Sequence, residues 1–489
     1  MILLILPPLK FIMYKAVNSG YSFSVSPLLF VFLVFAISSG GKMFGQKSES
    51  HEGPWTLQQC VEYALKTSLQ LRQTELTSDV NNVNLKQSEA GVLPTFNGFA
   101  THTYNDGPTL DPYTNTLANT TVLSQQMGIS SGLNLFSGLQ KYNSIKQNQF
   151  SYLAGKYDIE KSKNDISLNV AQDYLQILFN EELLEVAQNQ LDITQKQLDR
   201  TQKLYSAGTV AKGSLLDMQA TLASDELTLA NTQNQLDLSF LAIEQLMNLD
   251  STTGFKLQKP DYDLPLENLL LFTPAQIYSE AVKHFPEVKS AELKLNSAEK
   301  GVAAAKGGIS PQLSFNASYG TGYSGLPQES YKIIGYNSSG PIISTTTTTD
   351  GFLKQYDENA NSALGFKLTV PLFNGLQTSS AISKARISMI SAEVTVEQTR
   401  QVLKKSIQQA YADAGAALKK YMATKKAIDA SQESFKYSEQ KYNVGALNVF
   451  DYNLAKSKLA KAKSDLIQAK YDFLFKSKVL DFYQGKALY

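Results

Sequence analysis

The chain has 489 residues and a formal net charge of +1 with 18% charged residues, so no overall field argues for nucleic acid as a partner. Cys60 is the only cysteine, which excludes an intramolecular disulfide and a cysteine zinc cluster. The three histidines are far apart, and the chain carries no nucleophilic-serine, Walker A or zinc-protease motif. We therefore expect no catalytic site, no metal and no cofactor.

Residues 1–45 have the features of an export signal. Residues 27–37 form an apolar stretch that is too short to span a bilayer comfortably, and two lysines precede it. The cleavage site stays open between the small residues at 38–41 and Gly45. No later apolar run approaches about 18 residues, so we expect no transmembrane helix in the exported chain.

Much of the remaining sequence occurs twice at a constant spacing. The segment Leu135–Gln140 returns 237 residues later as Leu372–Gln377, with one substitution. Upstream the spacing is 217 residues, as between Pro94 and Pro311, so the second copy contains 20 extra residues before Phe373. A duplication of this length predicts one body made of two similar halves.

We expect two repeats with the same order of elements. The first repeat, at 55–248, contains a helix to about Glu89, two strands and a long coiled-coil hairpin. The second repeat, at 274–485, follows the same order with a longer loop between its strands. Residues 249–273 are expected to link the two.

A heptad of apolar residues runs through both long helices of each repeat. In the first repeat its members are Ile177, Leu184, Leu191, Leu198 and Tyr205, then Leu215, Leu222, Leu229, Leu236 and Ile243. This spacing predicts coiled-coil packing, with a first helix of about 100 Å. Small residues such as Ala187 and Thr194 stand three positions further along, which allows each helix more than one neighbour. A simple antiparallel coiled coil remains the alternative.

Four segments alternate apolar with small or polar residues and predict strands, at 95–104, 126–135, 313–323 and 363–372. Strands of about ten residues with one apolar face fit an outer-membrane barrel, although a water-soluble sheet has the same pattern. Four strands cannot close a barrel, so we expect the chain to oligomerise. The face expected toward lipid consists of Leu313, Phe315, Leu364, Phe366, Leu368 and Val370.

Several motifs in this order resemble the TolC family of outer-membrane efflux proteins. They are Trp55-Thr56-Leu57 and the helix after it, Phe285-Pro286-Glu287, the strand start at Pro311, Pro371-Leu372-Phe373-Asn374-Gly375 and Tyr442-Asn443-Val444-Gly445. The resemblance covers about residues 55–485 and implies a mostly α fold with a small antiparallel β part. It also implies a homotrimer with one 12-stranded transmembrane β-barrel, continuous with a periplasmic α-helical barrel.

The resemblance carries a function with it. It implies the passive outer-membrane duct of a tripartite efflux pump, with a periplasmic adaptor and an inner-membrane RND, ABC or MFS transporter as partners. Type I protein secretion uses a similar duct and stays open. A secreted coiled-coil protein without a channel is the remaining alternative.

The turns of the two hairpins are the candidate functional site. Gly208 and Gly445 follow the first helix of each hairpin, where a left-handed residue is expected. Ser214 and Asp451 occupy equivalent positions, and both are expected to cap the second helix.

The resemblance assigns these tips to a periplasmic entrance that the adaptor contacts. Tyr205 and Tyr442 would belong to this site, and Asp451 would form a ring of charge in the assembled channel. The family's gating arginine is Leu447 here and its second ring aspartate is Leu454, so those two roles do not carry over.

The two hairpins also differ in charge. Residues 166–250 hold 12 acidic and 4 basic side chains, whereas residues 403–487 hold 8 acidic side chains and 16 lysines. Hairpins that alternate in a ring would place opposite charges side by side, so we expect ion pairs between them. Unrelated solvated faces explain the same counts.

Overall fold

The computed structural model describes residues 53–111, 113, 115, 117–249, 255–259, 272–326, 328–348 and 351–486. The expected export signal and most of the expected linker lie outside these residues. Apart from Gly53, the described residues belong to one compact unit, Pro54–Tyr489.

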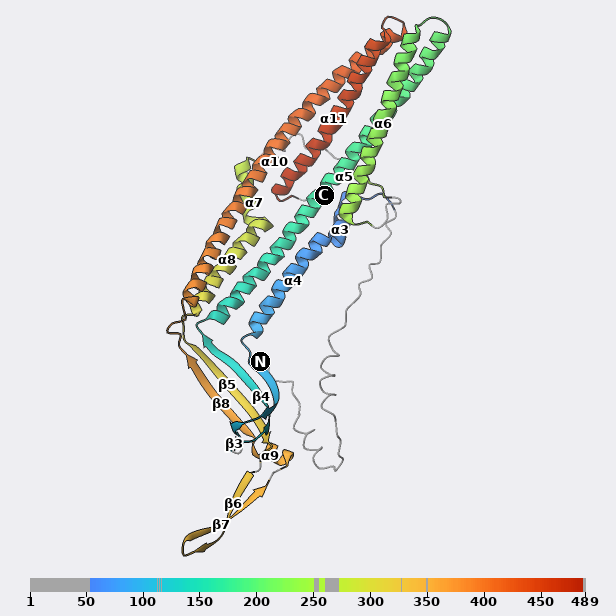
Figure 1. Ribbon diagram of the computed structural model, residues 1–489. Coiled ribbons are helices and arrows are strands. Elements are labelled where there is room, and N and C mark those ends of the chain that lie inside the picture. The colour runs from blue at the N-terminus through green and yellow to red at the C-terminus, as the bar shows by residue number, and fades with distance from the viewer. Residues whose placement is uncertain are drawn as a thin grey trace. The chain divides into compact units, whose positions relative to one another are not determined.

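Each half of this unit runs from short helices through strands to a long helical hairpin (Figure 1). The first half contains α3 (Leu57–Thr67), α4 (Leu69–Ala90), β1 (Thr95–Asn105), β2 (Pro108–Leu110), β3 (Leu117–Asn119), β4 (Val122–Ser137), α5 (Gln140–Ser206) and α6 (Lys212–Met247). The second contains α7 (Pro274–His284), α8 (Pro286–Gly307), β5 (Gln312–Ser324), β6 (Gln328–Asn337), β7 (Gly340–Thr348), α9 (Phe352–Glu358), β8 (Asn361–Thr369), α10 (Gln377–Asn443) and α11 (Val449–Tyr483).

Equivalent helices begin at equivalent residues. Helices α5 and α10 each contain 67 residues, and their first residues, Gln140 and Gln377, stand at the sequence spacing of 237. Both follow a non-glycine residue in the left-handed region, Leu139 with φ 63° and Leu376 with φ 64°. The strand-to-helix turn is therefore built in the same way in both halves.

The helix expected from Trp55 to about Glu89 is in fact two helices. Ser68 is extended, and its hydroxyl accepts a hydrogen bond from the backbone N–H of Leu71, so it ends α3 and caps α4. In the second half Phe285 interrupts the helix, because the residue before a proline disfavours the α conformation.

The four predicted strands form one antiparallel sheet in the order β1-β4-β5-β8. Strands β1 and β4 pair along their length, with Phe99 opposite Gly128. Strand β8 covers only part of β5, from Gln312 to Gly320.

The long loop expected at 324–361 contains secondary structure. Strands β6 and β7 form a separate hairpin, and α9 packs beside the end of β5 that β8 leaves unpaired. The side chain of Gln355 bonds to both the N–H and the carbonyl of Ser324, and Asn359 donates to the carbonyl of Gly322. Side chains of α9 thus satisfy backbone groups that would otherwise form an open strand edge.

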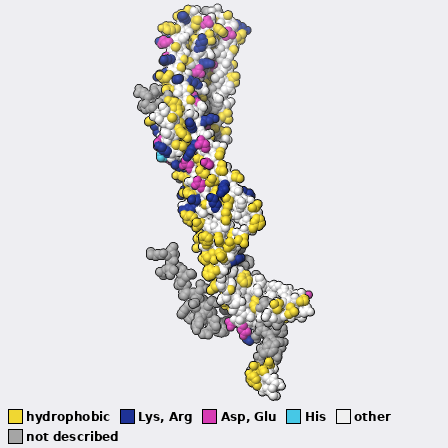
Figure 2. Space-filling view, turned by 90° about the vertical axis from the view of Figure 1, so that its left-hand side faces the viewer, with side chains coloured by type: hydrophobic (Ala, Val, Ile, Leu, Met, Phe, Trp, Pro, Cys, Tyr) yellow, Lys and Arg dark blue, Asp and Glu magenta, His cyan; other side chains and the backbone are white. Residues whose placement is uncertain are grey.

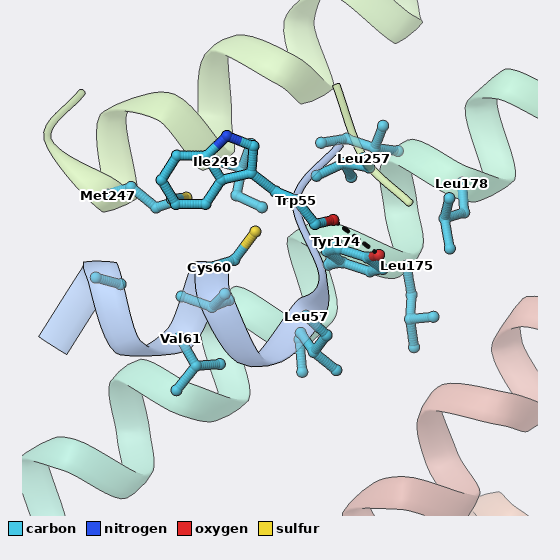
Figure 3. Packing of buried hydrophobic residues seen from close by; sticks show 14 of the residues in the cluster. Trp55, Leu57, Cys60, Val61, Tyr174, Leu175, Leu178, Ile243, Met247 and Leu257 are labelled. Carbon is cyan, nitrogen blue, oxygen red and sulfur yellow. Dashed lines mark hydrogen bonds between the residues drawn. The ribbon is translucent and has the colours of Figure 1, made fainter. Parts of the chain in front are cut away.

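Two hydrophobic clusters, one in each half, join the short helices to the long hairpins. In the first, the Tyr174 hydroxyl donates a hydrogen bond of 3.3 Å to the carbonyl of Trp55, next to the buried Cys60 (Figure 3). Trp55 also pairs with Leu257, so part of the expected linker packs into this cluster. The second cluster contains Phe285 and the long helices α10 and α11.

None of the helices in the described ranges is both long enough and apolar enough to cross a membrane. On the face shown in Figure 2, charged side chains lie mainly over the helices, while hydrophobic ones gather over the sheet and the helix ends next to it. The sheet end and the hairpin end therefore differ in surface chemistry.

Candidate functional sites at the sheet and the hairpin tips

One face of the four-stranded sheet is apolar and exposed. Cross-strand neighbours on this face include Leu368 with Leu313 and Phe366 with Phe315, whose ring centroids are 5.1 Å apart. Leu364, Phe366 and Leu368 are 75%, 72% and 65% exposed, which is far more than a water-soluble sheet leaves uncovered. Val370, also expected on this face, lies just beyond the last residue of β8 and is 50% exposed.

The opposite face is lined by small and polar residues. A hollow of about 500 Å³ lies there, lined by residues that include Thr95, Asn97, Ser130, Asn316 and Ser318. Lys367, opposite Ser314, belongs to this face and not to the apolar one. The sheet therefore separates an apolar surface from a polar one.

Both edges of this sheet are open in the single chain. Strands β1 and β8 are its outermost strands, and each of their residues is exposed. Unpaired backbone groups on an exposed apolar sheet are a template for another strand. The sheet is thus incomplete along both sides.

The predicted glycines end the first helix of each hairpin. Gly208 has φ 73° and Gly445 has φ 77°, and nothing lies within 4 Å of a Cβ placed on either. The N–H of Thr209 bonds to the carbonyl of Leu204, and the turn at Gly445 repeats this pattern. Both turns close by a Schellman motif, which needs a left-handed residue there.

The capping roles expected for Ser214 and Asp451 are wrong. Helix α6 begins after Ala211, which makes no side-chain cap, and Ser214 already lies in the first turn. Helix α11 is capped by Asn448, whose side-chain oxygen accepts the N–H of Asp451 at 2.8 Å and whose amide donates to the Asp451 carboxylate at 2.9 Å. The helix starts three residues earlier than the capping prediction requires, so the aspartate is held by the cap.

Aromatic packing surrounds the base of the second tip. Tyr452 is completely buried, and its ring stacks on Tyr442 with centroids 4.5 Å apart. Gln197 of the first hairpin donates a 3.4 Å hydrogen bond to the Tyr452 hydroxyl. Burial raises the pKa of Tyr452 to about 12, so this hydroxyl stays protonated at neutral pH.

A buried lysine joins the two hairpins near their tips. Lys456 of α11 is 3% exposed, and its Nζ lies 3.4 Å from an oxygen of Asp225 on α6 and 3.2 Å from the carbonyl oxygen of Gln190 on α5. It also donates to the hydroxyl of Thr194. Burial lowers the pKa of Lys456, while the charge of Asp225 acts in the opposite direction.

Two further contacts cross between the hairpins. Glu182 pairs with Lys470 at 2.9 Å and accepts a hydrogen bond from the Tyr471 hydroxyl at 2.6 Å. Arg200 donates to the side chain of Asn443 and, at 3.1 Å, to its carbonyl. Ion pairs between the oppositely charged hairpins therefore form within one chain.

These links escaped the sequence-based prediction, although a signal for one of them was present. Asp225 stands three positions after Leu222, at a seam position of the heptad where an apolar or small residue is usual. A carboxylate at such a position indicates a buried partner. The identity of Lys456 as that partner depends on how the two hairpins meet, which the sequence does not state.

The comparisons with known proteins agree with this fold. The model of the family described as outer membrane efflux protein matches residues 60–249 and 277–485. Outer membrane protein TolC of Escherichia coli (strain K12) is 24% identical over 435 residues, covering 86% of this chain and 80% of that protein.

Solved structures share the arrangement of elements at low sequence identity. A membrane protein from Pseudomonas aeruginosa superimposes with a TM-score of 0.73 at 19% identity, covering 88% of this chain and 90% of that one. The outer membrane protein VceC from Vibrio cholerae gives a TM-score of 0.71 at 15% identity, covering 88% and 97%.

Proposed function

The chain belongs to the outer membrane efflux protein family, and we propose that it is the outer-membrane exit duct of a tripartite efflux pump. Three copies would join their sheets into one 12-stranded barrel, and their helical hairpins would form a tube in the periplasm. A periplasmic adaptor would connect this tube to an inner-membrane transporter of the RND, ABC or MFS class. The duct itself would be passive.

The observation that carries this proposal is the incomplete sheet. Its apolar face suits lipid, its polar face suits a water-filled lumen, and both edges lack a strand. Lipid does not tolerate open strand edges, so closure with other copies is the arrangement that satisfies all three features. Exposed apolar residues on α10 and α4, such as Ile387 and Val83, are consistent with contact between copies along the helices.

The duplication gives the register of the closing strands. Within the chain, Ser130 of β4 lies opposite Ser318 of β5. Adding 237 to the first number and subtracting 217 from the second gives Lys367 of β8 opposite Thr101 of the next copy's β1. The same operation places Leu368 opposite Ala100, so the apolar faces of the two sheets become continuous.

The hairpin tips are proposed as the adaptor contact and the entrance. Val444 and Phe450 beside the second turn are 80% and 75% exposed, which offers an apolar surface at the place where Tyr442, Gly445 and Asp451 lie. On the first tip the corresponding residues are Tyr205, Gly208 and Ser214. Exposed apolar groups next to open turns are suited to a protein partner.

Thiol cross-linking tests the closing register. We expect Lys367→Cys combined with Thr101→Cys to give a covalent trimer on a non-reducing denaturing gel after oxidation, because directly opposite residues bring their Cβ atoms close. The matched control is Lys367→Cys with His102→Cys, whose side chains would face opposite sides of the sheet. A trimer from the control and none from the first pair would contradict the register and the ring.

The efflux role has its own test. Cells that lack the chain should accumulate an amphipathic dye, and the parent chain should restore its export. Restoration of a secreted protein with no change in dye export would favour type I secretion over efflux.

A further inference from the structure

The contacts between hairpins divide into two kinds of seam once the proposed ring is assumed. The within-copy seam joins α5 and α6 to α11 of the same chain, together with the end of α10, and is described above. The between-copy seam would join α10 and α11 to α6 of the next copy. We infer that the between-copy seam is the one that opens the entrance, while the two hairpins of each chain move as one body.

The within-copy seam is closed by buried charge. Lys456 reaches Asp225 and Thr194 from a position that is only 3% exposed, and Asp225 itself is 14% exposed. Separating such a pair leaves an unpaired charge in a poorly solvated place, which is far more unfavourable than separating exposed groups. The Glu182–Lys470 pair and the Arg200–Asn443 contact add to the same seam.

The between-copy seam can be derived from the within-copy seam because the hairpins are duplicated. A residue of the first hairpin has its counterpart 237 positions later, and a residue of the second hairpin has its counterpart 237 positions earlier in the next copy. Helices α5 and α10 obey this spacing at both ends. Each contact of the within-copy seam therefore has a defined equivalent.

The equivalents of the buried lysine network are neutral. Lys456 becomes Gln219 of the next copy, and its partners Asp225, Thr194 and Gln190 become Ala462, Ser431 and Ala427. Gln219 and Ala427 are exposed in the single chain, as expected of residues that await a neighbour. No ion pair survives at this position.

The other links change in the same way. Glu182 becomes Lys419, which would face Gln233 of the next copy in place of Lys470. Arg200 becomes Tyr437, which is 62% exposed and would face Ser206 in place of Asn443. The pattern extends toward the sheet, where the Asp158–Lys294 pair of 2.8 Å becomes Thr395 with Thr77.

This difference determines where the tips part. Neutral polar groups that lose a partner exchange it for water at little net cost, whereas a buried charge pair does not. A force that spreads the tips therefore separates neighbouring copies before it separates the two hairpins of one chain. The entrance would widen by three gaps between copies.

Two cysteine pairs at equivalent places test this inference. The within-copy pair is Thr221→Cys with Asn453→Cys, whose parent side chains are 3.3 Å apart. The between-copy pair is Leu216→Cys with Lys458→Cys, which are the equivalents of Asn453 and Thr221 and are both exposed. A short, reducible bis-thiol reagent would join each pair in the full chain in cells. Burial raises the pKa of the native Cys60 thiol to about 12, so that residue stays unreactive.

Dye efflux before and after reduction gives the result. We expect the between-copy link to form covalent trimers and to abolish efflux, and reductant to restore it. The within-copy link should leave the chain monomeric on a denaturing gel and efflux within about twofold of the unlinked variant. Block of efflux by the within-copy link, or full efflux with the between-copy link in place, would overturn the inference.

The outcome is separable from that of the ring itself, on which this inference rests. If Lys367→Cys with Thr101→Cys gives a trimer but Leu216→Cys with Lys458→Cys does not, the ring stands and the derived tip seam is wrong. If neither pair gives a trimer, the proposed ring fails.

Discussion

The sheet and the hairpin tips are incomplete in different ways, and the difference indicates how each is joined to other copies. The sheet offers unpaired backbone along β1 and β8, so its closure depends on strand register and on the phase of apolar residues. The tips offer side chains on helices whose backbone bonds are already satisfied. The sheet end is therefore suited to permanent closure, and the tip end to contacts that form and break.

The largest effect on stability is expected from the charge link between the hairpins. Lys456→Ala leaves Asp225 without its buried partner and should lower the free energy of unfolding by about 3 kcal/mol or more. Circular dichroism during urea unfolding of the purified protein measures this. Lys456→Met combined with Asp225→Leu should recover most of the loss. If the single variant unfolds with the parent, the link contributes nothing and the contrast between the two seams disappears.

The apolar face of the sheet should respond almost as strongly. Leu368→Arg places a charge toward lipid and should cost about 2–4 kcal/mol, whereas Lys367→Ser on the polar face should be mild. The fraction of heat-modifiable, folded protein in the outer membrane measures both. Equal insertion of the two variants would show that the strand phase is assigned to the wrong face.

Much of this contrast was readable from the sequence. The spacing of 237 residues fixed equivalent starts for α5 and α10, and alternation placed Leu364, Phe366 and Leu368 on one face. Both are local periodic patterns, which a single helix or strand expresses without knowledge of its neighbours.

The errors concern features that depend on competing local bonds or on tertiary contacts. Ser68 divides the first helix because its hydroxyl caps α4, and Asn448 takes the capping role expected of Asp451. Helix α9 forms where its Gln355 can satisfy the edge of β5. The seam around Lys456 requires the relative placement of two hairpins, which periodicity alone does not give.

The caps allow a smaller and more local test of the tips. Asn448→Ala should destabilise the first turn of α11 by about 1 kcal/mol, which is roughly a fivefold faster hydrogen exchange there. Ala211→Asn, at the equivalent position of α6, should slow exchange in that helix by a similar factor. Ser214→Ala is the control and should change exchange little, since Ser214 makes no cap. Faster exchange in the control than in Asn448→Ala would restore the original capping assignment.

The smallest effect on stability should accompany a clear effect on ions. Asp451→Asn keeps a side chain that can accept from Asn448 but removes one charge per copy, so unfolding should shift by less than about 1 kcal/mol. Reversal potentials in planar bilayers should show reduced cation selectivity and weaker block by divalent cations, because three such charges would be close together at the entrance. Unchanged selectivity and block would reduce Asp451 to a partner of the cap.

The central claim is that the chain completes its sheet only with copies of itself. Native mass spectrometry of the folded, detergent-extracted protein tests this most directly. The account predicts a particle of three chains, in keeping with four strands per copy in the described sheet. A folded, conducting particle of one or two chains would contradict it.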